Sequence, residues 1–148
     1  MSDGVTFPDE VSELLERPVT ATIATVNPDS TPQSTVVWFE RSGQGLALFA
    51  WEDAVKVRNM QRNPQVEVIV IDHERERYPG CPVYVRFIGT AEVKPGDPEM
   101  PDRLAIRYGE PDGYPRELGA FVSVYITPER ITGFGPYPGG AAGGWIQD

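Results

Sequence analysis

Short runs of β-branched and apolar residues alternate with polar ones along this chain, and they restrict its fold more than any other feature. The clearest run is VTATIATV, at residues 19–26. Alternation with a period of two is typical of a strand with one buried face. Similar runs follow at short intervals, and we expect further strands at residues 32–40, 46–51, 65–72, 83–93, 120–127 and 130–135.

Helices are expected to be few and short. PDEVSELLE, at residues 8–16, places its apolar residues on one face. A second helix is expected within WEDAVKVRNMQRNP, residues 51–64, and a third at RLAIRYG, residues 103–109. Six or seven strands with so few helices predict a mainly β (α+β) class and an antiparallel barrel. We expect one domain over residues 1–148.

The glycine-rich C-terminal segment lacks periodicity. It contains GGAAGG, and we expect residues from about 136 to 148 to form a flexible tail. A phosphate-binding glycine loop is an unsuitable interpretation, because the chain ends too soon for a helix of useful length to follow.

Charge and cysteine content exclude several classes of protein. The net charge is −9, from 13 basic and 22 acidic residues. Nucleic-acid binding normally requires a basic face, so this balance argues against it. One cysteine, Cys81, and one histidine, His73, argue against an intrachain disulfide and a structural zinc site. We expect both residues to be structural. The chain shows neither a signal peptide nor a membrane span, so a cytoplasmic protein is expected.

One basic cluster stands out against the acidic composition. Lys56, Arg58 and Arg62 fall within seven residues, directly after the strand expected to end at residue 51. The amide groups at the start of a helix favour an anion, and the cations would add to that attraction. The alternative is a solvated helix whose cations pair with Glu52 and Asp53. The residues alone leave these two interpretations evenly matched.

The order of these segments is similar to that of a known family. TATIATVNPDSTPQSTVVWFE, LALFAW, KVRNMQRNPQVEVIVID and VYVRFIGTAEV together resemble the pyridoxamine 5′-phosphate oxidase-like split β-barrel superfamily. The spacing K-x-R-N within the basic cluster is most like the branch of deazaflavin-dependent reductases that use coenzyme F-420. The resemblance covers about residues 19–93, roughly half of the chain.

This resemblance implies a split barrel of the FMN-binding type and a homodimer with two cofactor sites at the interface. It implies that the second strand lines the cofactor ring and that the corner and helix after the third strand hold the phosphate, with Lys56 as the main cation. The implied cofactor-binding residues are Gln33, Ser34, Thr35, Val36, Val37, Trp38, Ala50, Trp51, Lys56, Arg58, Asn59, Tyr84, Arg86 and Trp145. Glu52 and Asp53 depart from the family pattern, because acids beside the phosphate or a polyglutamate tail repel it.

The implied function is hydride transfer from reduced coenzyme F-420 to a small unsaturated or aromatic substrate. The alternatives are an FMN-dependent oxidoreductase and a non-enzymatic carrier of flavin, deazaflavin or haem. A structural dimer with an empty cleft is a third possibility. The sequence indicates no catalytic acid and no metal ligand, and its partners are expected to be a small-molecule substrate and a second copy, not nucleic acid or membrane.

Overall fold

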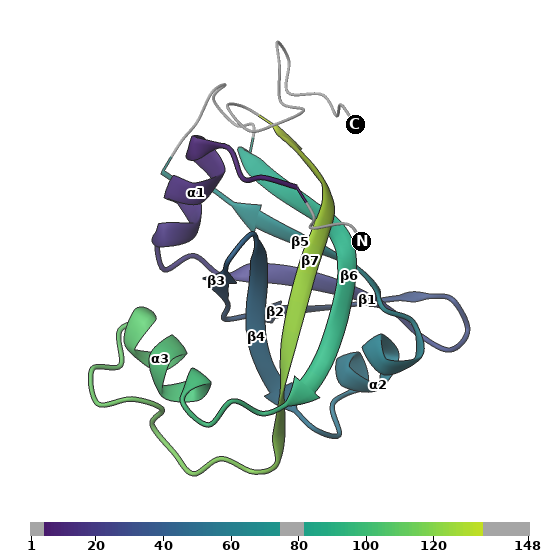
Figure 1. Cartoon of the computed structure of the whole chain (residues 1–148), viewed down its shortest axis with the longest axis vertical. Helices are drawn as coiled ribbons and strands as arrows, with labels where there is room; N and C mark the ends of the chain where they lie inside the picture. The colour runs from purple at the N-terminus through teal and green to yellow at the C-terminus, as the bar shows by residue number, and fades with distance from the viewer. Residues whose placement is uncertain (1–4, 75–81, 135–148) are drawn as a thin grey trace.

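A computed structural model describes residues 5–74 and 82–134. In this part of the chain, seven antiparallel strands form one curled sheet in the order β2-β1-β5-β6-β7-β4-β3 (Figure 1). The strands are β1 (Ala21–Val26), β2 (Pro32–Val37), β3 (Glu40–Ser42), β4 (Gly45–Trp51), β5 (Gln65–Ile71), β6 (Tyr84–Pro95) and β7 (Phe121–Phe134). The helices are α1 (Asp9–Glu16), α2 (Val55–Arg62) and α3 (Met100–Arg107). The predicted split β-barrel with a few short helices is confirmed.

The period-two pattern places one face of each long strand in the barrel interior. In β1, every second residue from Ala21 is buried, and β5 and β6 follow the same rule. Phe87 of β6 is fully buried, and its ring packs against Phe7 at a centroid distance of 5.6 Å. Figure 1 shows α1 near one end of the barrel and α2 and α3 near the other. The core therefore lies inside the curled sheet and is closed at its ends by helices.

The strand predicted at residues 32–40 is divided in the structure. β2 ends at Val37, and the chain bends at Trp38 and Phe39 before β3 pairs with β4. Phe39 is buried, and its N–H donates to the hydroxyl of Tyr108 at 3.1 Å. Because this backbone donor is satisfied outside the sheet ladder, the strand can end there without leaving a buried amide unpaired.

The two strands predicted at residues 120–127 and 130–135 form one continuous strand, β7, within the described residues. Pro128 lacks an N–H group, but it lies opposite Gly89 where the β6–β7 register shifts. A Cβ atom on Gly89 would lie 2.1 Å from the carbonyl oxygen of Thr127. The bulge thus carries the strand past the proline, with a close backbone approach at Gly89 that leaves no room for a side chain.

Helix ends differ modestly from the predicted ones. α2 begins at Val55 rather than near Trp51, because residues 52–54 form a turn in which the N–H of Ala54 donates to the carbonyl of Trp51 at 3.0 Å. α3 begins at Met100, three residues before the predicted start. The predicted flexible tail and Cys81 lie outside the described residues. None of the helices in the described part of the chain is long and apolar enough to cross a membrane.

Candidate functional site

A pocket of about 540 Å³ lies where the ends of β2 and β4, the start of α2 and the segment between α3 and β7 meet. Its lining is mostly apolar and aromatic, with two cations at its wall. The lining residues are Val36, Val37, Trp38, Phe49, Ala50, Trp51, Lys56, Tyr114, Pro115 and Arg116. Six of them are among the predicted cofactor-binding residues, namely Val36, Val37, Trp38, Ala50, Trp51 and Lys56.

Lys56 is half-buried in the first turn of α2. Its ammonium group donates one long hydrogen bond, 3.4 Å, to the hydroxyl of Thr35 on β2. Burial lowers the pKa of this ammonium group, because its charged form loses hydration. Within the described residues, no carboxylate forms an ion pair with it. A cation in this position is stabilised by an anionic ligand.

Asn59, one turn further along α2, is buried and belongs to a network of polar side chains. Its amide donates to the hydroxyl of Thr25 at 3.0 Å and to the side-chain oxygen of Asn27 at 2.9 Å. Its own oxygen accepts a hydrogen bond from Arg62 at 2.9 Å, and Thr25 in turn donates to Gln33 at 3.2 Å. Two predicted site residues, Asn59 and Gln33, therefore lie in a network that fixes α2 against β1 and β2.

Arg58 is exposed and lies outside the pocket lining. Its guanidinium donates to the backbone carbonyl of Asp53 at 2.8 Å, which ties α2 to the preceding turn. The solvated-helix interpretation predicted ion pairs with the carboxylates of Glu52 and Asp53. In the described part of the chain, Arg58 bonds the carbonyl instead. Val57 is buried and Val55 exposed, so α2 turns one apolar face to the barrel, as the sequence pattern requires.

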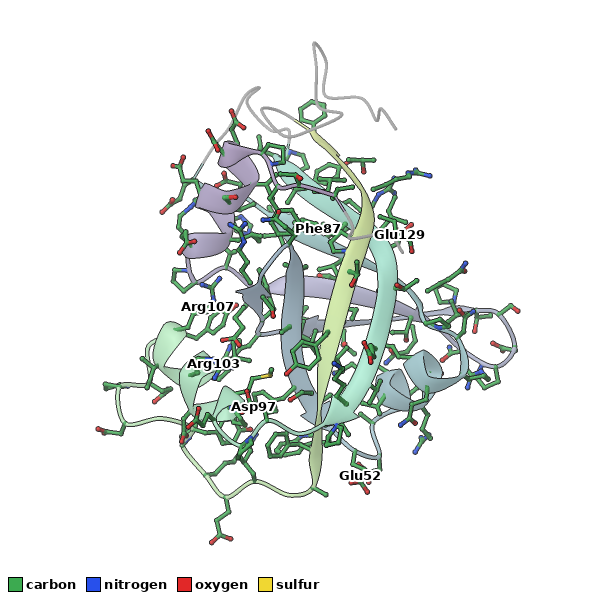
Figure 2. All side chains as sticks on the ribbon, in the orientation of Figure 1. Glu52, Phe87, Asp97, Arg103, Arg107 and Glu129 are labelled. Atoms are coloured by element: carbon green, nitrogen blue, oxygen red, sulfur yellow. The ribbon has the colours of Figure 1, made fainter. Side chains whose placement is uncertain are left out.

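Glu52 and Asp53 line a second pocket of about 530 Å³ that adjoins the first. Its remaining lining is formed by Trp51, Arg116, Glu117, Gly119 and Ala120. Figure 2 shows Glu52 at the end of β4, projecting away from the strands. Trp51 and Arg116 border both pockets, so an apolar pocket with cations stands next to an acidic one.

Aromatic side chains form one wall of the first pocket. The ring of Phe49 packs edge-on against Trp51 at 6.2 Å and against Tyr114 at 5.6 Å. Trp38 stacks on Tyr108 of the α3 end at 5.0 Å, with the planes only 5° apart. The Tyr108 hydroxyl donates to the carbonyl of Val19 at 2.6 Å. This hydrogen bond holds the tyrosine ring against which the indole of Trp38 packs.

Residues 114–116 were not predicted as part of a site. They lie in a segment without periodicity, and only the nearby prolines and glycines marked it as a loop. The N–H of Tyr114 donates to a carboxylate oxygen of Asp102 on α3 at 2.8 Å, and this contact brings the segment to the pocket. No sequence signal indicates a contact between residues twelve positions apart on different elements.

The other predicted residues fall elsewhere. Ser34 is exposed on β2, and Tyr84 and Arg86 begin β6. Arg86 lies opposite Ile69 of β5, and its guanidinium donates to the hydroxyl of Thr132 at 3.2 Å. Neither Tyr84 nor Arg86 lines the pocket of its own chain. Trp145 lies outside the described residues.

No arrangement of three or more metal-binding side chains occurs among residues 5–74 and 82–134. His73 lies exposed in the turn after β5.

Comparisons with known proteins give one family and several similar folds. The sequence matches the family model for pyridoxamine 5′-phosphate oxidase over residues 7–135. The structure is similar to that of an F-420 reductase, with a TM-score of 0.69 and 29% sequence identity, covering 84% of this chain and 98% of that one. No curated protein matches the chain.

Two further structures are similar at lower identity. One is a conserved hypothetical protein from Mycobacterium tuberculosis, with a TM-score of 0.71 and 23% identity, covering 90% of this chain and 88% of that one. The other is the heme storage protein HutZ from Vibrio cholerae, with a TM-score of 0.67 and 21% identity, covering 87% and 95%. At these identities the likeness concerns the fold.

Proposed function

Because the chain belongs to the pyridoxamine 5′-phosphate oxidase family, we propose that it is an oxidoreductase that uses reduced coenzyme F-420 to reduce a small unsaturated or aromatic substrate. The observation that carries this proposal is Lys56, a half-buried cation without a carboxylate partner among the described residues, in a pocket with apolar and aromatic walls. Such a pocket suits a flat conjugated ring that carries a phosphate. The 29% identity to an F-420 reductase favours the deazaflavin.

The roles of the residues follow from their positions. Lys56 would bind the cofactor phosphate, with Thr35 holding its ammonium group in place. Val36 and Val37 at the end of β2 would lie against the ring, and Trp38 would support it from its stack on Tyr108. Bound F-420 supplies the hydride, while the chain positions the ring and excludes water from it.

Exposed apolar residues on the outer face of the sheet support the proposed homodimer. Val36 is 70% exposed on β2 and Ile71 is 40% exposed on β5, and both lie on the outer face of the sheet. A third pocket, of about 500 Å³, lies on this face, and its lining includes Pro32, Ile88 and Arg130. A second copy covering this face would bring its own residues beside Val36, at the edge of the cofactor pocket. Tyr84 and Arg86 would then approach the cofactor of the partner subunit.

FMN is the second candidate cofactor, and one observation favours it. Glu52, Asp53 and Glu117 border the pocket that adjoins the Lys56 pocket. A polyglutamate tail passing there would meet like charges, whereas the single phosphate of FMN would not extend so far. Each like-charge contact near the surface costs on the order of 1 kcal/mol at an effective dielectric of about 20 and moderate separation.

Titration of the purified protein with each cofactor tests the proposal. We expect F-420 to bind, and Lys56→Ala to weaken binding by about ten- to a hundred-fold, the loss typical of a charged hydrogen bond. Lys94→Ala is the matched control, because Lys94 is an exposed cation that lies outside the pocket lining. Tight binding of FMN without binding of F-420 would replace the first candidate with the second.

Hydride turnover separates an enzyme from a carrier. Reduced cofactor is mixed with the protein and a panel of enones and quinones, and the absorbance of the cofactor is followed. Re-oxidation that depends on both protein and acceptor is expected. Tight cofactor binding without turnover of any acceptor would instead support a carrier.

A further inference from the structure

The wall of the pocket carries a second cation, Arg116, which is exposed. Arg116 lines the same pocket as Lys56, and among the described residues it has neither a hydrogen bond nor an ion pair. Its guanidinium lies 5.9 Å from the ring centre of Tyr114, which is a weak contact for an exposed cation. Two other arginines of this acidic chain have protein partners: Arg103 pairs with Glu40 at 2.7 Å, and Arg107 donates to two backbone carbonyls.

The segment that carries Arg116 is anchored rather than loosely attached. The N–H of Tyr114 donates to Asp102, and a Cβ atom on Gly113 would lie 2.7 Å from the same carboxylate oxygen. Gly113 has a φ of +94°, a conformation that favours glycine, and Pro115 fixes one further dihedral just before Arg116. The guanidinium is therefore presented at the pocket from a defined backbone position.

The surroundings of Arg116 indicate what it can bind. Phe49, Trp51 and Tyr114 form an aromatic wall beside it, and Lys56 stands in the same pocket. A guanidinium has a planar fork of donors that matches a carboxylate in a bidentate arrangement. An aromatic ring with a carboxylate would thus find both an apolar wall and a charge partner.

We infer that Arg116 binds the carboxylate of the substrate, and that the substrate class is a flat conjugated carboxylic acid. This inference rests on the proposed function, in which Lys56 is already engaged by the cofactor phosphate. Each cation then has its own anion: the phosphate at α2 and the substrate carboxylate at the segment between α3 and β7. Arg116 also borders the neighbouring acidic pocket with Glu52, Asp53 and Glu117, whose charges disfavour an anion there, so the apolar pocket is the better place for the carboxylate.

A pair of ligands with the same shape and different charge tests this inference. Naphthalene-2-carboxylate and naphthalene-2-carboxamide are titrated by calorimetry into the full-length protein loaded with oxidised cofactor. The wild type should bind the carboxylate more tightly than the amide. Arg116→Gln should weaken carboxylate binding by about ten-fold or more, as expected for the loss of a charge-assisted bidentate contact, and leave amide binding unchanged.

Two further variants test whether the preference for the carboxylate depends on a positive charge at position 116. Arg116→Lys retains the charge and should restore part of the preference for the carboxylate. Lys94→Gln removes one positive charge outside the pocket lining, so it should leave the preference unchanged. Carboxylate binding that is equal in the wild type and in Arg116→Gln would overturn the inference, as would displacement of the cofactor by the carboxylate.

The outcomes also separate this inference from the proposed function. Absence of cofactor binding in the wild type contradicts the proposed function itself. Cofactor binding that depends on Lys56, together with equal affinity for the two naphthalene ligands, contradicts only the role of Arg116.

Discussion

At the scale of single residues, Lys56 shows how burial and function are coupled. The fold holds its ammonium group half-buried next to one hydroxyl, and this burial lowers its pKa. The charged form is therefore less stable in the folded protein than in water. A phosphate at this position would reverse that effect, because an anion favours the charged form. The half-buried charge of Lys56 lowers the stability of the fold in the absence of a ligand, and a bound anion would offset this cost.

The lowered pKa of Lys56 predicts a pH dependence. Its folded-state pKa lies below its unfolded-state value, so the cost of burying the charge is present below the folded pKa and is relieved as pH rises through it. Cofactor affinity should fall over the same alkaline range, because deprotonation removes the positive charge. Binding measured from about pH 7 to about pH 11 checks this expectation.

Lys56→Arg is the control for this pH dependence. A guanidinium remains charged throughout the range, so this variant should bind the cofactor with an affinity that varies little with pH. A wild-type affinity that stays constant up to about pH 11, above the ordinary lysine pKa, would contradict the role of Lys56 as the phosphate cation.

At the scale of elements, the pairing of β6 with β7 depends on one close backbone approach. Gly89 lies opposite Pro128 at the bulge, where only a residue without a side chain fits against the carbonyl of Thr127. Gly89→Ala should lower the free energy of unfolding by about 3 kcal/mol or more, because the added methyl group overlaps the backbone. Urea unfolding followed by circular dichroism measures this loss.

Gly119→Ala is the matched control for the bulge. A Cβ atom at Gly119 meets nothing within 4 Å, so the same substitution should change stability by less than about 1 kcal/mol. An equal loss in both variants would show that the cost reflects glycine replacement in general and not the bulge.

The elements also show what the sequence can and cannot predict. Alternating apolar residues in the sequence predicted β1, β5 and β6, and the structure shows the matching alternation of buried side chains. The position of the basic cluster after β4 pointed to Lys56 as a candidate for the site. The division between β2 and β3 could not be predicted, because it depends on a hydrogen bond from Phe39 to a tyrosine 69 positions away. Pro128 indicated a strand break that the bulge avoids.

The candidate site was predictable where it is built from regular elements. Val36 and Trp51 were implied by the family resemblance, and both line the pocket where β2 and β4 end. Tyr114 and Arg116 were missed because their position depends on the contact of the loop with Asp102. Arg58 was also implied as a cofactor-binding residue, and its guanidinium donates to the backbone carbonyl of Asp53 in the preceding turn.

At the scale of the whole molecule, the proposed dimer makes a prediction about two exposed isoleucines. Ile71 is 40% exposed on the outer sheet face, and Ile106 is 56% exposed on α3. Ile71→Glu should shift the protein from dimer toward monomer and weaken cofactor binding, because a charge would be buried between the copies. Sedimentation velocity measures the first effect, and cofactor titration measures the second.

Ile106→Glu introduces the same charge at a more exposed position outside the proposed interface. It should leave both the dimer and cofactor affinity unchanged. A monomeric wild-type protein, or loss of the dimer in Ile106→Glu alone, would contradict the assignment of the outer sheet face as the interface.

The order of the strands has a consequence for the location of the pocket. β2 and β3 are the two edges of the sheet, yet only Trp38 and Phe39 separate them along the chain. The two edge strands are therefore joined directly by the chain. The outer edge of β2 has backbone N–H and C=O groups that pair with no neighbouring strand of the described sheet. Such an edge is usually a liability for aggregation. Here Val37 and Trp38, at the end of β2, also line the pocket, so a flat ligand with polar edges bound there would lie beside these backbone groups.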